Sequence, residues 1–450
     1  MNFNVKGSLM GQLRSDFEFH ALAAERLNLP DTATVRAATP ALLPGLASVC
    51  LTAVKPDIRS LLREELEARF KDWAVPAYRV TQVLAWLYER RAASWDELTN
   101  LPKALHERLA AEFSLINLEL VRKQGARDTT QKFLWRLPDG AMIESVLIPA
   151  NPALYSEASD RQTLCVSTQV GCAYGCKFCA SGLDGWKRNL NVEEIVGQIL
   201  AVERLSQGAS SSLATQAVEN RSNGVLESDV PNTPPLQHSP RPDTTPSSGS
   251  RTITNLVFMG MGEPLANYEN LLKSLRILNA AWGCGIGARK ITISTSGLVP
   301  QIRKLAAEPE QFRLAISLHG ATDEVRNRIM PVNRKYPLTD LTAACEFYQQ
   351  RKNKLITLEY ILIDSVNDDL DQVAPLAHLA RRLFAKVNLI PYNKVDGLDW
   401  KRPSDERCQK FAERLKAAGA IATLRLEKGG DIDAACGQLR LKTEKELAAK

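Results

Sequence analysis

The stretch Cys172-Ala173-Tyr174-Gly175-Cys176-Lys177-Phe178-Cys179 comes at the end of an apolar run that is typical of a β-strand. Its three cysteines have the spacing C-x3-C-x2-C, so one short loop can bring three thiolates to one point. A [4Fe-4S] cluster has four irons and normally takes four cysteine ligands. Three thiolates would therefore leave one iron open to bind another molecule.

The main alternative is that this loop binds zinc, and the other is that its three thiols have unrelated roles. Structural zinc sites have four closed ligands, commonly in paired C-x2-C units. No second cysteine pair or Cys-His cluster follows Cys179. The spacing favours a cluster with an open iron, which is what reductive cleavage of S-adenosylmethionine requires.

Length and composition are those of an ordinary globular protein, with 450 residues of which 44% are apolar and 24% are charged. A chain of this length predicts a main domain with at least one smaller domain. The formal net charge of +6 is a weak indication of a polyanionic partner.

The cysteine count and the apolar runs indicate the compartment. The longest nearly apolar run, residues 41–54, is too short to span a bilayer and contains Pro44. The N-terminus lacks the order of a signal peptide. Nine cysteines, an odd number, argue against a disulfide scaffold and for metal or redox chemistry. We therefore expect a cytoplasmic protein with no membrane partner.

Three segments precede the cysteine loop. Residues 1–55 lack sustained periodicity and are interrupted by prolines, so we expect a poorly ordered N-terminal extension or a wrongly assigned start codon. Residues 56–125 carry apolar residues at helical spacing and predict a helical accessory domain. Residues 126–160 predict a β-hairpin and connector, with Asp139-Gly140 at the turn.

From residue 161 to 440, short apolar runs alternate with amphipathic stretches. Such alternation predicts parallel β/α units, and about six of them predict an α/β fold built as a partial (β/α)6 barrel. In such folds the chemistry takes place at the C-terminal ends of the strands. The strand candidates are residues 164–168, 253–259, 290–295, 312–318, 356–363, 387–391 and 422–426. Residues 441–450 are expected to form a C-terminal tail.

One segment interrupts the alternation. Residues 206–250 contain 20 Ser, Thr or Pro in 45 positions and no Phe, Tyr, Trp, Ile or Met. Such a segment cannot bury enough apolar surface to offset its ordering entropy. We expect a disordered insertion, with a charged regulatory loop as the alternative.

Motifs along the chain resemble those of a known family. The run Thr163-Leu164-Cys165-Val166-Ser167-Thr168-Gln169-Val170-Gly171-Cys172 is similar to that of the RlmN/Cfr group of radical-SAM RNA methyltransferases. The later matching motifs are Gly260-Met261-Gly262-Glu263-Pro264, Ser294-Thr295-Ser296-Gly297, Ser317-Leu318-His319, Ile390-Pro391-Tyr392-Asn393 and residues 430–439. The resemblance covers about residues 57–440 apart from the insertion, and it implies a radical-SAM barrel with an N-terminal RNA-binding domain.

The resemblance also implies which residues hold the cofactors. Cys172, Cys176 and Cys179 would bind a [4Fe-4S] cluster. The residues expected to contact S-adenosylmethionine are Gly262, Glu263, Ser294, Ser317, Leu318, His319 and Asn393. Each lies at the C-terminal end of a predicted strand. Taken alone, Gly-x-Gly is often a tight turn, and an isolated Ser or Asn is more often a helix cap.

Cys436 narrows the reaction that the resemblance implies. In the family, the matching cysteine is methylated by one S-adenosylmethionine and then carries the methyl group to RNA, so two are used per turnover. Cys165 matches the cysteine that forms a disulfide with the carrier, and Glu144 matches the proposed proton acceptor. From the residues alone, both cysteines would be buried core residues and Glu144 a solvent-facing carboxylate. How Glu144 and Cys165 divide proton removal stays open.

RNA contacts are expected from basic residues near the mouth of the barrel. These are Arg326, Arg328, Arg334 and Lys335, together with Trp186-Lys187-Arg188. The target base would have to leave its stack to reach a buried cysteine. We also expect an external electron donor and a monomeric protein.

The predicted reaction is methylation of adenine C2 in 23S-type ribosomal RNA and in transfer RNA next to the anticodon. Adenine C2 is an electron-poor carbon, which explains a radical route through a nucleophilic cysteine. Methylation of adenine C8, as in Cfr, is the alternative within enzymes, because both products use the same residues. An RNA-binding iron-sulfur protein without methylation is the alternative of a different class.

Overall fold

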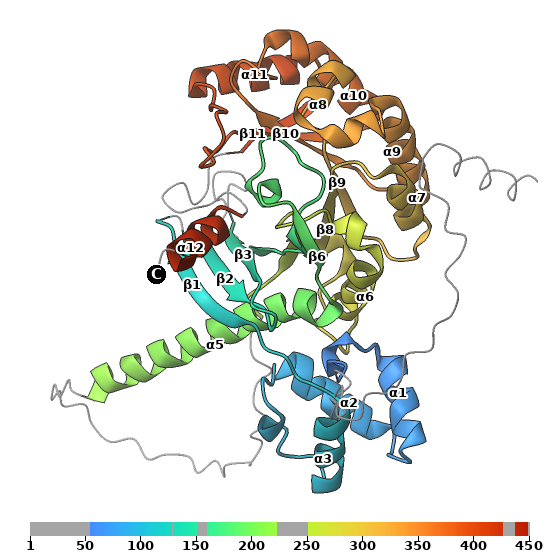
Figure 1. Ribbon diagram of the computed structural model, residues 1–450, viewed down its shortest axis with the longest axis vertical. Helices are drawn as coiled ribbons and strands as arrows, with labels where there is room; N and C mark the ends of the chain where they lie inside the picture. The colour runs from blue at the N-terminus through green and yellow to red at the C-terminus, as the bar shows by residue number, and fades with distance from the viewer. Residues whose placement is uncertain (1–54, 128, 151–159, 223–250, 426–436, 449–450) are drawn as a thin grey trace, which may run out of the picture. The chain divides into compact units, whose positions relative to one another are not determined.

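The computed structural model describes residues 55–127, 129–150, 160–222, 251–425 and 437–448 (Figure 1). The described residues from Lys55 onward belong to one compact unit. The predicted N-terminal extension, apart from Lys55, and Cys436 lie outside the described residues. In the part of the chain that is described, no helix is long and apolar enough to cross a membrane.

A helical module begins the described chain. Its elements are η1 (Ile58–Ser60), α1 (Arg63–Asp72), α2 (Tyr78–Leu84), the π-turn η2 (Ala85–Glu89), η3 (Trp95–Glu97) and α3 (Lys103–Glu112). Leu66 and Phe70 lie four residues apart on α1 and are buried together with Val83 of α2 and Leu109 of α3. The predicted helical region is therefore present, but it is shorter than residues 56–125. Residues 119–125 form a strand instead, because they pair with the following hairpin.

Ten strands form one sheet in the order β1-β2-β3-β4-β7-β8-β9-β10-β11-β12. The antiparallel part contains β1 (Glu119–Gly125), β2 (Gln131–Arg136) and β3 (Met142–Pro149), which pairs with β4 (Gln162–Cys165). The parallel part continues from β4 through β7 (Asn255–Phe258), β8 (Ile291–Thr295), β9 (Arg313–Ser317), β10 (Thr357–Leu362), β11 (Lys386–Pro391) and β12 (Ile421–Leu424). The sheet does not close, so the predicted partial α/β barrel is confirmed, and β12 corresponds to the predicted strand at residues 422–426.

Helices cover the outer face of the parallel strands (Figure 1). They are α5 (Val192–Ser222), α6 (Tyr268–Asn279), α7 (Val299–Ala307), α8 (Asp323–Ile329), α9 (Leu338–Lys352), α10 (Val373–Arg382) and α11 (Asp405–Ala417). Short 3-10 turns are η4 (Ala180–Gly182), η5 (Pro264–Asn267), η6 (Ala288–Lys290), η7 (Pro331–Arg334) and η8 (Leu370–Gln372). A small hairpin of β5 (Gln169–Gly171) and β6 (Trp186–Asn189), absent from the sequence prediction, flanks the cysteine loop.

Two segments differ from their sequence predictions. Helix α5 continues to Ser222, so residues 206–222 of the predicted disordered insertion are helical, while residues 223–250 lie outside the described part. Alanines at positions 209, 214 and 217 favour this continuation, since Ala is the best helix former. The predicted C-terminal tail belongs to α12 (Gln438–Ala448), which packs on β3.

Side chains alternate between the two faces of each strand, and this decides which residues line the inside of the barrel. On β10, Tyr360 stacks on Phe411 of α11 and thus points to the outer helices. Glu359 therefore points inward. Its register partners are Ser317 on β9 and Asn388 on β11, which share the inner face. The interior of the barrel is polar at this level.

Candidate active site

The cysteine loop is held by close backbone contacts between β5 and β6. Gly171 has φ +75°, and a Cβ atom there would lie 2.0 Å from the carbonyl oxygen of Gly185. The Cys172 N–H donates to that same oxygen at 2.9 Å. Only glycine fits at position 171, because any side chain would open this contact. The sequence before the first cysteine thus fixes where the loop begins.

The three thiols lie near one another. Burial raises the pKa of Cys172 to about 12 and raises the pKa of Cys176 well above its usual value, and neighbouring cysteines in the loop raise both further. Within the described ranges, no three side chains converge as tightly as the ligands of one metal ion. A [4Fe-4S] cluster binds each thiolate at a different iron, so neighbouring but separated thiols fit it.

Glu263 is a buried carboxylate at the end of β7 beside this loop. Its Oε2 accepts from the Ser296 N–H at 2.7 Å, and its Oε1 accepts from the Leu265 N–H at 3.1 Å. Burial raises the pKa of Glu263, and these backbone donors oppose the rise. Glu263 in turn raises the pKa of Cys172 and Cys176, so its carboxylate lies close to the loop. Contact between Glu263 and S-adenosylmethionine stays a prediction.

Gly262 has a structural reason to be glycine. Its φ is +100°, and a Cβ atom would lie 2.5 Å from the Cβ of Gln169. Gln169 uses this space to accept from the Glu263 N–H through Oε1 at 2.8 Å. The tight-turn interpretation therefore explains Gly262 fully. Its contact with S-adenosylmethionine stays a prediction.

Two serines meet on the inner face of the sheet. Ser294 on β8 and Ser317 on β9 have their Oγ atoms 3.3 Å apart. Both lie at or near the C-terminal ends of their strands, where the sequence predicted a cofactor site. Neither serine caps a helix, so the helix-cap alternative does not account for them.

His319 is held as a neutral ring facing the cysteine loop. Its Nδ1 accepts from the Ile361 N–H at 3.0 Å, which leaves the proton on Nε2. Burial, followed by the nearby charge of Arg326, lowers the pKa of His319 to about 3. The ring meets Phe178 edge-on with centroids 4.8 Å apart. Leu318, which precedes it, is buried and donates its N–H to the Glu359 carbonyl oxygen.

Asn393 follows β11 and is half-buried. Its neighbour Tyr392 is buried, and Cys179 raises the pKa of that phenol after burial does. The strand end that carries Asn393 thus lies beside the cysteine loop. Cofactor contact by Asn393 stays a prediction.

Glu144 on β3 is buried, although from the residues alone it would be a solvent-facing carboxylate. Its Oε2 lies 2.9 Å from the Nζ of Lys132, which is itself fully buried. Oε2 also accepts from the Gly437 N–H at 2.7 Å, and Oε1 accepts from the Arg440 N–H at 2.7 Å. The carboxylate therefore caps the start of α12 at the residue after Cys436.

Cys165 lies on the same side of the sheet as Glu144. It pairs with Val146 on β3, which is two residues after Glu144 and so shares its face. Leu439 of α12 packs on Leu134 and Met142, also on this face. Cys165 and the beginning of α12 thus occupy one side of β2 to β4.

Gly437 also touches the end of the cysteine loop. It has φ +85°, and a Cβ atom there would come within 3.0 Å of the backbone nitrogen of Ser181. Ser181 lies two residues after Cys179. The residue after Cys436 is therefore packed between Glu144 and the segment that follows the last cysteine.

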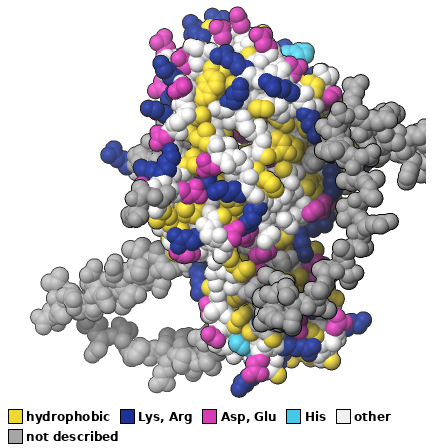
Figure 2. Space-filling view, viewed as in Figure 1, with side chains coloured by type: hydrophobic (Ala, Val, Ile, Leu, Met, Phe, Trp, Pro, Cys, Tyr) yellow, Lys and Arg dark blue, Asp and Glu magenta, His cyan; other side chains and the backbone are white. Residues whose placement is uncertain are grey.

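Some of the residues expected to contact RNA are exposed, whereas others are buried or held in ion pairs. Arg328, Arg334 and Lys335 are exposed, and so are Trp186 and Lys187. Arg188 instead binds Glu194 and Asp139 in ion pairs of 2.7 Å each. Arg326 is fully buried, so its predicted RNA contact is wrong. On the face in Figure 2, Lys and Arg side chains are interspersed with Asp and Glu and do not form one continuous patch.

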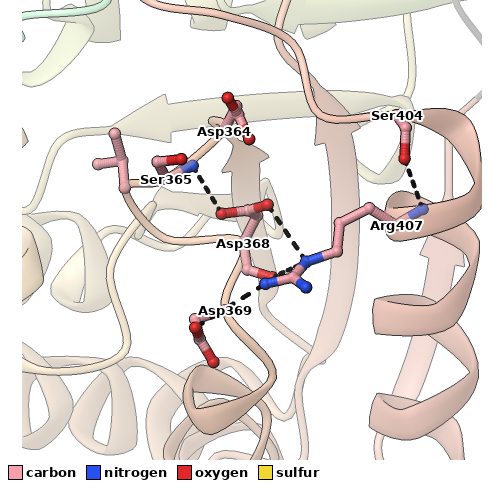
Figure 3. A pocket seen from close by; sticks show the side chains of 7 residues that line it. Asp364, Ser365, Asp368, Asp369, Ser404 and Arg407 are labelled. Carbon is pink, nitrogen blue, oxygen red and sulfur yellow. Dashed lines mark hydrogen bonds and ion pairs between the residues drawn. The ribbon is translucent and has the colours of Figure 1, made fainter.

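An open hollow at the end of β10 is a separate feature (Figure 3). Asp364, Asp368 and Asp369 line it, and Arg407 pairs with Asp368 at 3.3 Å and with Asp369 at 3.8 Å. None of its lining residues belongs to the predicted site. Its acidic lining is unsuited to a phosphate backbone.

Three buried ionisable residues escaped the sequence analysis of the cofactor and methyl-carrier sites. Lys132 pairs with Glu144, Arg326 lies under the cysteine loop, and Glu359 points into the barrel beside Ser317. Burial raises the pKa of Glu359, and its Oε2 has no hydrogen-bond partner in the described structure. Strand alternation could have placed Glu359 inward, but the sequence gives no sign of the other two contacts.

Comparisons with known proteins bear on this geometry. Residues 57–115 match the model of the ribosomal RNA large subunit methyltransferase N-terminal domain, and residues 249–376 match the radical SAM superfamily. The chain is 49% identical to the probable dual-specificity RNA methyltransferase RlmN 3 of Opitutus terrae, over 88% of this chain and 97% of that protein. The chain belongs to the RlmN family.

Other RlmN relatives agree. Identity is 47% to the probable dual-specificity RNA methyltransferase RlmN of Akkermansia muciniphila, over 88% of this chain and 98% of that one. The crystal structure of a radical SAM methyltransferase from Sphaerobacter thermophilus superposes with a TM-score of 0.71 at 41% identity, covering 85% of this chain and 98% of that chain. This RlmN family member is thus a radical SAM methyltransferase, and a [4Fe-4S] cluster and S-adenosylmethionine are the cofactors of that superfamily.

Proposed function

We propose that the protein methylates C2 of adenine in large-subunit ribosomal RNA and in transfer RNA next to the anticodon. The names of its relatives, which act on RNA with dual specificity, support an RNA substrate of two kinds. We further propose that it acts in the cytoplasm as a monomer, takes electrons from an external donor, and uses two molecules of S-adenosylmethionine per turnover.

The contacts of Gly437 carry this proposal. One residue away from Cys436, Gly437 meets Glu144 through a 2.7 Å hydrogen bond and packs against Ser181 beyond Cys179. Because Gly437 is bonded to Cys436 in the chain, its contacts with a buried carboxylate and with the segment after Cys179 support a carrier role for Cys436. The separation of these parts in sequence, 293 positions for Glu144 and Gly437, makes their meeting informative.

The proposed chemistry assigns a separate task to each cysteine. When bound, the cluster supplies the electron that splits S-adenosylmethionine into methionine and a 5′-deoxyadenosyl radical. Loss of one hydrogen atom from methylated Cys436 leaves a methylene radical on its sulfur, and this carbon adds to C2. The ring radical then has to give up one electron, which the oxidised cluster could take back when it is bound, and C2 loses its proton to Glu144. The thiolate of Cys165 attacks the sulfur of Cys436, which forms a disulfide and breaks the bond between sulfur and methylene. The electron pair of that bond stays on the methylene carbon, which takes a proton and becomes the methyl group.

Glu144 has two proposed roles. As a base it would take the proton that leaves C2, and as a helix cap it holds the carrier segment. Its described donors are the Lys132 ammonium and the Gly437 and Arg440 amides.

Analysis of the modified nucleoside tests the proposed position of methylation. Ribosomal or transfer RNA that lacks the modification is incubated with reconstituted protein, a reductant and S-adenosylmethionine, and its nucleosides are analysed by mass spectrometry. The expected product is 2-methyladenosine. Finding 8-methyladenosine alone would replace this proposal with the Cfr-type reaction.

Variants of the two cysteines test the carrier mechanism. Cys436→Ala is expected to abolish methyl transfer while the cluster still forms and cleaves S-adenosylmethionine. Cys165→Ala is expected to accumulate protein joined to RNA through Cys436. Normal methylation by Cys436→Ala would refute the carrier mechanism, and turnover without any crosslink in Cys165→Ala would refute the resolving role of Cys165.

A further inference from the structure

Arg326 is a buried cation at the centre of the site. It lies on α8 and has no exposed surface. Its guanidinium donates to four neutral oxygens, namely the Leu318 carbonyl at 3.0 Å, the Ser296 carbonyl at 2.5 Å, the Asn333 Oδ1 at 2.8 Å and the Ser317 carbonyl at 3.4 Å. Two of these carbonyls belong to the loops that follow β8 and β9. The side chain thus ties together two strand ends of the predicted cofactor site.

No carboxylate neutralises this guanidinium directly. Among the ion pairs of the described residues, none includes Arg326. The nearest acid in its network is Asp323, which reaches it only through the side chain of Asn333. Burial lowers the pKa of Arg326 to about 10, so the group stays charged at neutral pH. A desolvated charge without a countercharge is costly, so an anion bound beside this guanidinium would be stabilised by it.

The cysteine loop lies where that anion would be. The Lys177 N–H donates to the Ile329 carbonyl oxygen at the end of α8 at 2.9 Å, so the helix of Arg326 and the loop are joined. The Leu318 carbonyl that accepts from Arg326 belongs to the residue just before His319. His319, which meets Phe178 in the loop, also senses the charge of Arg326. The guanidinium therefore acts on the loop electrostatically from beneath.

We propose that Arg326 is the buried countercharge of the iron-sulfur cluster and favours its reduced state. Reduction adds one negative charge to the cluster. A fixed positive charge in a dry site stabilises the more negative state more strongly, since water is not there to screen it. The inference rests on a cluster at Cys172, Cys176 and Cys179, and it does not depend on which carbon of adenine is methylated.

A redox titration of the reconstituted cluster tests the proposal without RNA. Arg326→Met removes the charge and keeps an apolar side chain of similar length, whereas Arg326→Lys keeps the charge. At a fixed potential, Arg326→Met is expected to show at least a tenfold lower ratio of reduced to oxidised cluster, a shift of about 59 mV for one electron. Arg326→Lys should stay within threefold of the unmodified protein. Iron and sulfide content are measured in each sample.

A second pair of variants applies if Arg326→Met does not fold. The double variant Asp323→Asn with Asn333→Asp moves one negative charge onto the atom that contacts the guanidinium and leaves the net charge unchanged. It is expected to lower the ratio at least tenfold as well. Asn333→Ala deletes that hydrogen bond, keeps the charge of Arg326 and should leave the ratio within threefold.

The possible outcomes distinguish failure of the proposed cofactor site from failure of the proposed countercharge. If the unmodified protein binds no cluster, the proposed cofactor site is wrong. If the cluster forms but Arg326→Met or the double variant shifts the ratio by less than threefold, only the countercharge is refuted. A shift as large in Asn333→Ala as in the double variant would also refute it, because geometry alone would then explain the effect.

Discussion

The Oε2 atom of Glu144 lies 2.7 Å from the backbone nitrogen of Gly437, although the two residues are 293 positions apart in the chain. This hydrogen bond joins the antiparallel part of the sheet to the first residue of the chain described after Cys436. It makes Glu144 a structural anchor of the segment that carries the proposed methyl group.

Glu144→Ala is expected to loosen the start of α12. The change removes the acceptor of the Gly437 and Arg440 amides and breaks the buried ion pair with Lys132, at a cost of about 3–5 kcal/mol in unfolding free energy. Hydrogen exchange should rise at those two amides, while the amides of α9 stay protected. The double variant Lys132→Met with Glu144→Gln should recover part of the stability, and unchanged exchange at Gly437 in Glu144→Ala would contradict the anchor.

His319 is expected to stay neutral across the physiological pH range. Its pKa, lowered to about 3 by burial and by Arg326, means that the folded protein binds this proton less readily than the unfolded chain. The ring nitrogen shifts in a ¹⁵N-histidine NMR titration of the cluster-free protein should be constant from pH 5 to 8, with the proton on Nε2. A titration of this ring with a midpoint in that range would contradict the geometry at Ile361.

Glu359→Gln is expected to stabilise the protein at high pH only. Because burial raises the pKa of Glu359, the folded state holds this proton more tightly than the unfolded chain. The stability of the unmodified protein is therefore complete below the ordinary glutamate pKa and falls as pH rises through the raised value. Gln keeps the acceptor for the Asn388 amide at 3.0 Å and cannot ionise.

The measurement is the difference in melting temperature between Glu359→Gln and the unmodified protein. It should be close to zero at pH 4 and about 2 °C in favour of the variant at pH 8. Comparing the two proteins at each pH cancels the contributions of other ionisable groups. A difference that does not change with pH would show that Glu359 carries no such penalty.

Trp186→Ala is expected to weaken RNA binding about tenfold, as loss of one stacked base would. Trp186 follows the cysteine loop and is 49% exposed, which suits an aromatic platform for a base. Phe384→Ala is the matched control, because Phe384 is 77% exposed but precedes β11 at the opposite end of the strand. Affinity is measured by filter binding, and an equal loss in both variants would contradict a specific role for Trp186.

The sequence was sufficient to predict the parallel sheet and the cysteine loop. The seven apolar runs from residue 164 onward match β4 and β7 to β12, because buried parallel strands need continuous apolar runs between helices. The spacing of Cys172, Cys176 and Cys179 likewise predicts one loop, and the thiols lie close together. These features depend on local spacing, which a sequence displays directly.

Charged residues were harder to place. Arg326 looked like one of several exposed basic residues, but the turn of α8 puts it on the inner side with Ile329 and leaves Arg328 outside. Glu144 stands on a strand whose alternation does not say which face will be covered. The cover is α12, from the far end of the chain. Such contacts follow from tertiary packing, and local pattern does not contain them.

The close packing of Gly437 limits which residues the protein can have at this position. Since a Cβ atom there would come within 3.0 Å of the Ser181 nitrogen, the missing methyl group of one residue sets the spacing between two segments. A gap between these two segments would admit hydrogen donors, and a hydrogen donor quenches a radical intermediate. A side chain at position 437 is thus expected to uncouple radical formation from methyl transfer. The variant Gly437→Ala would be expected to convert S-adenosylmethionine to 5′-deoxyadenosine without methylating RNA, before methylation stops altogether.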